Sequence, residues 1–147
     1  MGDIYYQQVD ITIASDATQD LWSLFAGATR KVRLLGWELT SAAVAAALID
    51  INLHRISAVG SVGAASSTEE LADELSGALT ASVRTEDTTP GTDAGGLMSY
   101  QWEQLGPVGH VFTPEMAPIS KVSEGFALTC NTAIVATLSG WICWEEV

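Results

Sequence analysis

Apolar and polar residues alternate with a period of two along most of this chain, and this pattern restricts the fold class more than any other feature. In residues 48–56, for example, Ile49, Ile51 and Leu53 alternate with polar residues. Successive side chains of a strand point to opposite faces, so the alternation indicates strands with one buried face. About nine such segments are separated by turn residues, at residues 9–13, 21–25, 31–40, 48–56, 79–84, 98–103, 110–113, 126–128 and 134–145. We therefore expect an all-β fold, a sandwich or a barrel of antiparallel strands.

Three segments between these strands follow other patterns. Residues 41–47 are interpreted as a small-residue connection, with a helix as the alternative, because they are rich in Ala, the best helix former. Ser67 and Glu70 match a capping box, which predicts a short surface helix over residues 68–76. Residues 88–96 combine Thr, Pro and Gly and predict a loop. We expect at most one short helix in the fold.

Size and composition limit the class of protein. The chain has 147 residues, of which 48% are hydrophobic and 16% are charged, a balance that excludes a disordered chain. We expect a single β-sandwich domain over residues 1–147, with residues 1–26 as a candidate extended N-terminal arm plus the first strands. The formal net charge of −12 disfavours nucleic acid and anionic membranes as partners, because phosphate binding depends on Lys and Arg. An acidic chain with so few charges suggests that part of its apolar surface is buried in an assembly.

The sequence shows no targeting pattern. No basic segment precedes an apolar one near residue 1, as in a signal peptide, and the longest strongly apolar run covers only residues 42–49. A membrane span needs roughly 18 apolar residues. Cys130 and Cys143 are interpreted as reduced core thiols. We expect a soluble protein that is made in a cytoplasm.

Signatures of catalysis and of metal binding are absent from the sequence. There is no phosphate-binding Gly-Lys loop, no Gly-x-Ser-x-Gly elbow and no Cys-x-x-Cys pair. His54 is expected to be solvated and His110 structural, and Glu86, Asp87 and Asp93 are expected to form a solvated acidic loop rather than a calcium site. The sequence predicts no enzyme, no metal and no cofactor.

Basic and aromatic residues are the candidates for binding. Arg30 and Lys31 form a local positive patch, which is either a strand end kept soluble by charge or a docking contact for an acidic partner. Tyr5 and Tyr6 are adjacent, so at most one can enter the core and the other is a candidate interface anchor. Trp102 and Trp141 are candidates for an oligomer interface or a glycan platform, with the core as the competing interpretation.

The layout of residues 28–147 resembles small jelly-roll proteins of tailed-phage virions. The resemblance is carried by the segments Ala28-Thr29-Arg30-Lys31-Val32-Arg33-Leu34, a polar Gly/Ser loop, Tyr100-Gln101-Trp102, Pro114, Gly125-Phe126-Ala127-Leu128 and Gly140-Trp141-Ile142-Cys143-Trp144-Glu145-Glu146. In particular, the chain resembles capsid decoration proteins, also called cement or head-stabilising proteins. This resemblance implies a jelly-roll β-sandwich of about eight to nine strands, commonly trimeric, that ties major capsid subunits together at threefold or quasi-threefold positions on the outer shell. The family has no catalytic residues to carry over.

The expected function is therefore that of a structural virion protein whose partner is the major capsid protein and which forms a homotrimer. Tyr5, Tyr6, Arg30 and Lys31 are its candidate capsid contacts. The alternative is a receptor- or carbohydrate-binding head of a phage fibre, and a third class is a cupin-like enzyme or metal protein. The charges are unevenly distributed along the chain, which suggests a polarity hypothesis. In it, the basic residues at 30–33 dock on the partner, and the acidic residues at 69–74, 86–87 and 145–146 face water.

Overall fold

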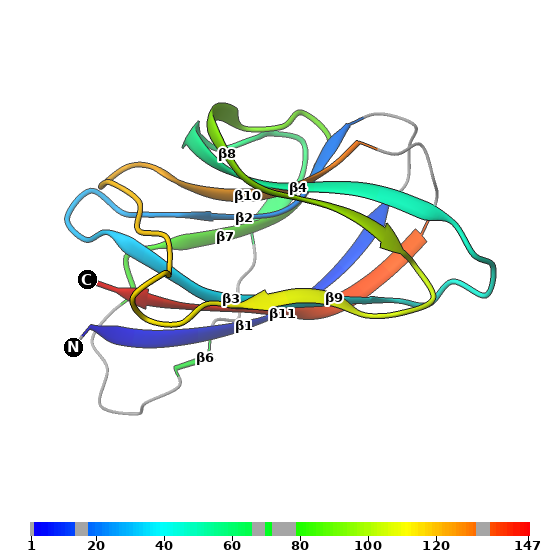
Figure 1. The fold of residues 1–147 in the computed structure, drawn as a ribbon. Coiled ribbons are helices and arrows are strands. Elements are labelled where there is room, and N and C mark those ends of the chain that lie inside the picture. The colour runs from blue at the N-terminus through cyan, green and yellow to red at the C-terminus, as the bar shows by residue number, and fades with distance from the viewer. Residues whose placement is uncertain (1, 14–17, 66–69, 72–78, 132–135) are drawn as a thin grey trace.

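Two antiparallel sheets face each other in the structure, a computed structural model that describes residues 2–13, 18–65, 70–71, 79–131 and 136–147 (Figure 1). The first sheet has the strand order β6-β1-β11-β3-β9 and the second the order β5-β7-β2-β10-β4-β8. The described residues form eleven strands, which are β1 (Asp3–Ile13), β2 (Gln19–Phe25), β3 (Val32–Ser41), β4 (Leu48–Ala58), β5 (Ala64–Ala65), β6 (Glu70–Leu71), β7 (Ser82–Asp87), β8 (Thr92–Glu103), β9 (Val108–Val111), β10 (Gly125–Cys130) and β11 (Ala136–Glu146). Two of them are only two residues long, and no helix occurs among the described residues.

The strand pairing is that of a jelly roll. The first four long strands pair with the last four in reverse order, as β1 with β11, β2 with β10, β3 with β9 and β4 with β8. Such pairing arises when a long double-stranded ribbon is rolled so that successive pairs fall in alternate sheets. The pairing also brings the two ends of the chain together on neighbouring strands β1 and β11 (Figure 1). The expected jelly-roll-like β-sandwich is confirmed.

The segment between β4 and β8 adds strands to one side of both sheets. Within it, β7 pairs with β2, β5 pairs with β7, and β6 pairs with β1. The opposite side of the sandwich ends on β8 in one sheet and on β9 in the other. The additions leave that second side uncovered by any further strand among the described residues.

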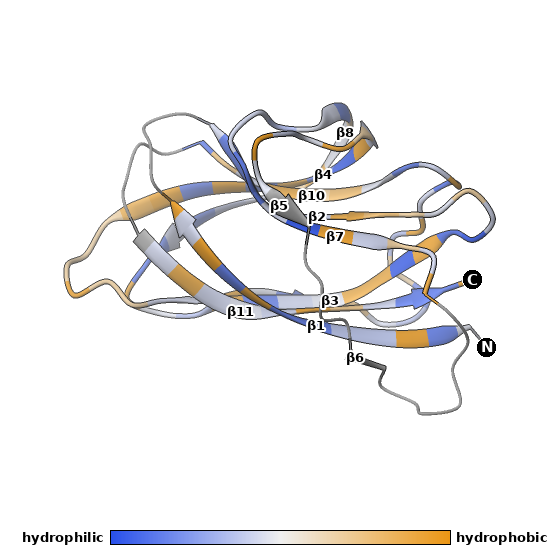
Figure 2. Cartoon of the chain, turned by 180° about the vertical axis from the view of Figure 1, so that it is seen from behind, coloured by the Kyte–Doolittle hydropathy of each residue, from blue (hydrophilic) through white to orange (hydrophobic). Residues whose placement is uncertain are grey.

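The core lies between the sheets and follows the period-two pattern. Along β1, buried and exposed residues alternate, and Figure 2 shows hydrophobic and hydrophilic residues alternating toward the C-terminal end of the strand. On β11 the side chains of Leu138, Ile142 and Trp144 are buried, as the alternation predicts. Trp22 and Trp37 are also fully buried, and their rings lie 6.2 Å apart between the sheets. Large aromatic rings at the centre supply much of the apolar area that a domain of this size must bury.

The structure confirms some of the expectations for single segments and corrects others. Residues 42–47 connect β3 to β4 without a helix, so the interpretation as a connection is confirmed. The loop expected at residues 88–96 is wrong for residues 92–96, which belong to β8 and pair with β4 through bulges. The strand expected over residues 79–84 is found three residues later, as β7 over Ser82–Asp87, so residues 79–81 are corrected to a connection. The first strands expected within residues 1–26 are found as β1 over residues 3–13 and β2 over residues 19–25.

The short helix expected over residues 68–76 falls mostly outside the described residues. Within it, Glu70 and Leu71 form a short strand that pairs with Tyr6 and Tyr5. Cys130 is buried in the core as expected, whereas Cys143 is half-buried on the outer face, and both are free thiols. No helix long and apolar enough to cross a membrane is found in the described part of the chain.

Candidate functional site

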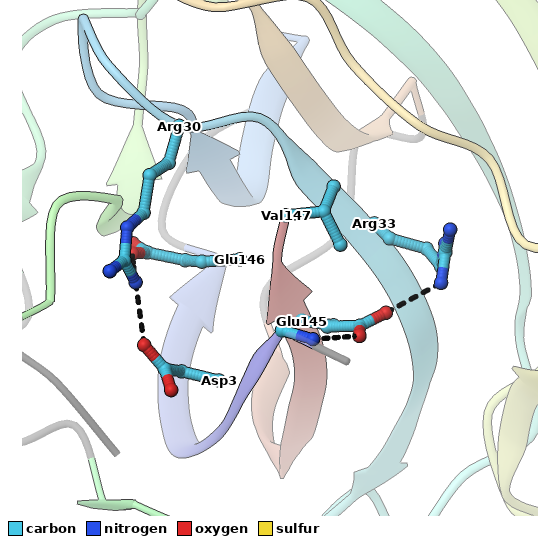
Figure 3. A pocket seen from close by; sticks show the side chains of 7 residues that line it. Asp3, Arg30, Arg33, Glu145, Glu146 and Val147 are labelled. Carbon is cyan, nitrogen blue, oxygen red and sulfur yellow. Dashed lines mark hydrogen bonds and ion pairs between the residues drawn. The ribbon is translucent and has the colours of Figure 1, made fainter.

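Arg30 of the predicted basic patch lines an open cleft of about 560 Å³ where the two ends of the chain meet (Figure 3). Arg30 forms an ion pair with Asp3 at 2.5 Å, and Arg33 forms one with Glu145 at 2.6 Å. The hydrogen bond to Asp3 raises the pKa of the Arg30 guanidinium. Because its charge is matched by carboxylates of the same chain, Arg30 offers a partner little net positive charge.

Glu145 and Glu146 do not face water, which corrects the polarity hypothesis at this end of the chain. Their side chains are 8% and 0% exposed. Glu146 accepts hydrogen bonds from the backbone N–H groups of Thr80 and Ala81 at 2.8 and 2.5 Å, and lies 3.5 Å from Arg30. Hydrogen bonds satisfy these buried carboxylates, as burial of charge requires. The Glu146 side chain therefore links β11 to the residues that directly precede β7.

The remaining capsid-contact candidates are separated by the structure. Lys31 is exposed, and its backbone N–H and C=O pair with those of Val147. Tyr5 is only 1% exposed and stacks on Trp144 in the core, where desolvation raises the pKa of its hydroxyl. Tyr6, on the outer face of the same sheet, is half-buried. Of the tyrosine pair, only Tyr6 is therefore positioned to touch a partner.

The two candidate tryptophans also differ in position. Trp102 is 3% exposed, and its Nε1 donates to the carbonyl of Gly106 at 2.6 Å, so it belongs to the core. Trp141 is half-buried on the outer face of the first sheet, where it stacks against Tyr6 with a centroid distance of 5.7 Å and an interplanar angle of 20°. Hollows of about 220 and 290 Å³ lie beside the Trp141 ring. Trp141 is thus the one of the two that can serve as a platform.

A groove of about 460 Å³ opens along the uncovered side of the sandwich, between β8 and β9. We call it the edge groove. None of its lining side chains carries a formal charge when histidine is neutral; they are Leu97, Met98, His110, Val111, Phe112, Thr113, Met116 and Pro118. Val111 and Met116 are 71% and 78% exposed. The groove is an apolar surface at the end of both sheets.

His54 is held in a polar row across the outer face of the second sheet, which corrects the expectation of a solvated side chain. It is 12% exposed, with Nδ1 3.1 Å from Asp93 and Nε2 2.5 Å from the hydroxyl of Thr129. The Thr129 hydroxyl donates its proton to Asp20 at 2.7 Å. A hydroxyl used in this way has no proton to give to His54, so the row is not a nucleophile–base pair. The hydrogen bonds of this row connect the four strands β8, β4, β10 and β2.

The expected solvated acidic loop is wrong at Asp87. This residue is 1% exposed and accepts hydrogen bonds from Arg84 and from the backbone of Gly63. Glu86 accepts a hydrogen bond from the backbone N–H of Thr12, and the Asp93 side chain is 69% exposed. The residues that the structure describes contain no group of three or more His, Cys, Asp or Glu that could hold a metal ion.

No protein-family model, curated protein or solved structure matches this chain. Sequence reasoning did not identify the edge groove, because its residues come from two separate segments, 97–98 and 110–118, and neither is distinctive alone. The one available signal was the apolar content of residues 108–118.

Proposed function

We propose that this chain is a structural, non-catalytic protein of a tailed-phage virion. It binds the outside of the icosahedral capsid as a homotrimer and stabilises the shell by bridging major capsid subunits. The observation that carries the proposal is the open side of the sandwich, where a long edge strand borders the uncharged edge groove.

The edge strand β8 has twelve residues, so its main chain offers many hydrogen-bonding groups on the side away from β4. Soluble proteins usually protect such edges with Lys, Pro or bulges. β8 contains neither Lys nor Pro, and its bulges against β4 are confined to the part before Met98. Residues 98–103 therefore form a regular edge that supports the addition of a strand from another protein.

The edge groove supplies the apolar part of the same surface. A partner strand on β8 could place an apolar side chain in the groove, where no charge has to be desolvated. Main-chain hydrogen bonds then give affinity and the groove gives selectivity. A protein that binds only the assembled shell stabilises that state by mass action and needs no chemistry.

The most direct test adds the purified protein to undecorated phage heads and measures their resistance to heat and to chelators. We expect saturable binding and a higher disruption temperature. The Val111→Asp variant places a charge in the edge groove and should lose both effects. Val111 is 71% exposed, so the substitution costs little folding stability.

Val44→Asp is the matched control, because Val44 is 98% exposed and lies outside the edge groove. It should bind heads as the unmodified protein does. Absence of binding by the unmodified protein, or equal loss in both variants, would contradict the proposal.

A further inference from the structure

We infer that the outer face of the first sheet carries a binding site for neutral carbohydrate, with the indole ring of Trp141 as its stacking surface. This inference goes beyond capsid stabilisation and does not depend on it, since the Trp141 ring lies outside the edge groove. The smaller hollow beside the ring adjoins that groove and shares His110 and Val111 with it. A virion protein with such a site could also contact sugars outside the shell.

The Trp141 ring is fixed against the sheet by two neighbours. A Cβ atom at Gly36 on β3 would lie 3.3 Å from the Cη2 and Cζ3 atoms of the indole, so the ring rests on a strand position that has no side chain. Tyr6 on β1 stacks against the ring at 5.7 Å. A ring held in this way loses little conformational freedom when a ligand arrives, which favours binding.

Polar side chains surround the ring in the larger hollow. The hydrogen-bonding groups there are those of Gln8, Asp10, Glu38, Thr40 and Ser139. Ser139 donates to Asp10 at 2.9 Å, so the carboxylate is held in place and keeps further lone pairs for a ligand. Glu38 lines both hollows and is exposed. The two hollows have volumes of about 220 and 290 Å³. Sites for drug-sized ligands typically have volumes of about 300–1,000 Å³, so hollows of this smaller size suit single small rings.

A sugar ring matches this combination of groups. One face of a pyranose presents C–H bonds, whose slightly positive hydrogens are attracted to the negative face of an aromatic ring. Its hydroxyls are donors, and hydrogen bonds to carboxylates are about twice as strong as neutral ones. Asp10 lines the larger hollow beside Trp141, and Glu38 lines both hollows.

The charge of the face selects neutral sugars. Neither hollow is lined by Lys or Arg, and the formal net charge of the chain is −12. Like charges placed close together cost free energy, so uronic acids and sialylated glycans are disfavoured. The same repulsion disfavours nucleic acid and anionic lipid on this face.

The test measures binding of soluble oligosaccharides to the full chain by calorimetry and by tryptophan fluorescence. Cello-, malto- and chitohexaose are the neutral probes, and oligogalacturonate and sialyllactose are the acidic ones. We expect at least one neutral probe to bind and both acidic probes to fail. Trp141→Ala should weaken neutral binding at least tenfold while the circular dichroism spectrum stays unchanged.

Two further variants keep the test decisive. Glu38→Gln retains the ring and should weaken neutral binding while reducing the discrimination against acidic probes. Met116→Ala removes an exposed apolar side chain from the edge groove and should bind sugar as the unmodified protein does.

The inference is overturned if no neutral probe binds, or if Trp141→Ala binds as well as the unmodified protein. It is also overturned if light scattering shows that Trp141→Ala dissociates an oligomer that binds no sugar, because a second copy then covers the face. Each of these results leaves the head-binding experiment unaffected, so the two proposals fail separately.

Discussion

Replacement of Glu146 by Ala should destabilise the protein strongly, although the residue lies next to the C-terminus. Its side chain is fully buried and accepts hydrogen bonds from the backbone N–H groups of Thr80 and Ala81 and from the Thr80 hydroxyl. It also lies 3.5 Å from Arg30. The substitution removes the acceptor for all of these donors at once.

The cost follows from what each donor can do afterwards. The Ala81 N–H is buried and would be left without a partner, at about 1–3 kcal/mol. Thr80 is exposed, so water can replace part of its loss, and Arg30 is 39% exposed, so its weakened ion pair contributes little. With the small cavity added, we expect a loss of about 2–4 kcal/mol in the free energy of unfolding. For a chain of this length, that corresponds to a decrease in Tm of roughly 5–15 °C.

Urea and thermal unfolding followed by tryptophan fluorescence measure this change. Glu146→Gln keeps one acceptor oxygen, so its loss should be smaller, about 1 kcal/mol. Glu103→Ala removes an exposed glutamate from β8 and is the matched control, with no change expected beyond about 0.5 kcal/mol. If Glu146→Ala were as stable as this control, the claim that the buried Glu146 carboxylate stabilises the fold through these hydrogen bonds would be refuted.

Two other properties of the chain can be predicted. Burial raises the pKa of the Cys143 thiol, and Cys130 lies fully in the core. Iodoacetamide at pH 7 should therefore label Cys143 slowly and Cys130 only after unfolding, as measured by mass spectrometry. Rapid labelling of Cys130 in the folded protein would contradict the position of β10. Hydrogen bonds from the backbone of Gly95 and from His54 lower the pKa of the Asp93 carboxyl. This carboxylate therefore stabilises the fold at pH values above its unfolded pKa of about 3.9. The contribution is lost as the pH falls through the folded pKa. The decrease in urea midpoint between pH 6 and pH 3 should therefore be slightly smaller in Asp93→Asn. An equal decrease would show that neither hydrogen bond, from Gly95 or from His54, stabilises the Asp93 carboxylate.

The fold was largely predictable because its dominant signal is local. The alternation along β4 and β11 assigned their buried faces, and Leu138, Ile142 and Trp144 lie in the core as predicted. Residues 92–96 were misassigned because Gly and Thr there resemble a loop. Their strand conformation depends on pairing with β4 through bulges, and pairing between distant segments leaves no local pattern.

The surfaces were less predictable because they are made by topology. The sequence shows Arg30 beside Lys31, but only the pairing of β1 with β11 brings Asp3 and Glu146 to Arg30. His54 likewise has partners on β8 and β10 that its own strand does not indicate. The edge groove exists because β8 and β9 end their respective sheets on the same side.

Hydrogen exchange of the protein, free and bound to phage heads, tests the proposed mode of capsid binding most directly. The account predicts that amides of residues 98–103 in β8 and of the edge-groove segment 110–116 gain protection on the shell, while the β1 and β11 amides around Tyr6 and Trp141 keep their exchange rates. Protection that appears only around Trp141, or no protection anywhere under saturating conditions, would contradict it.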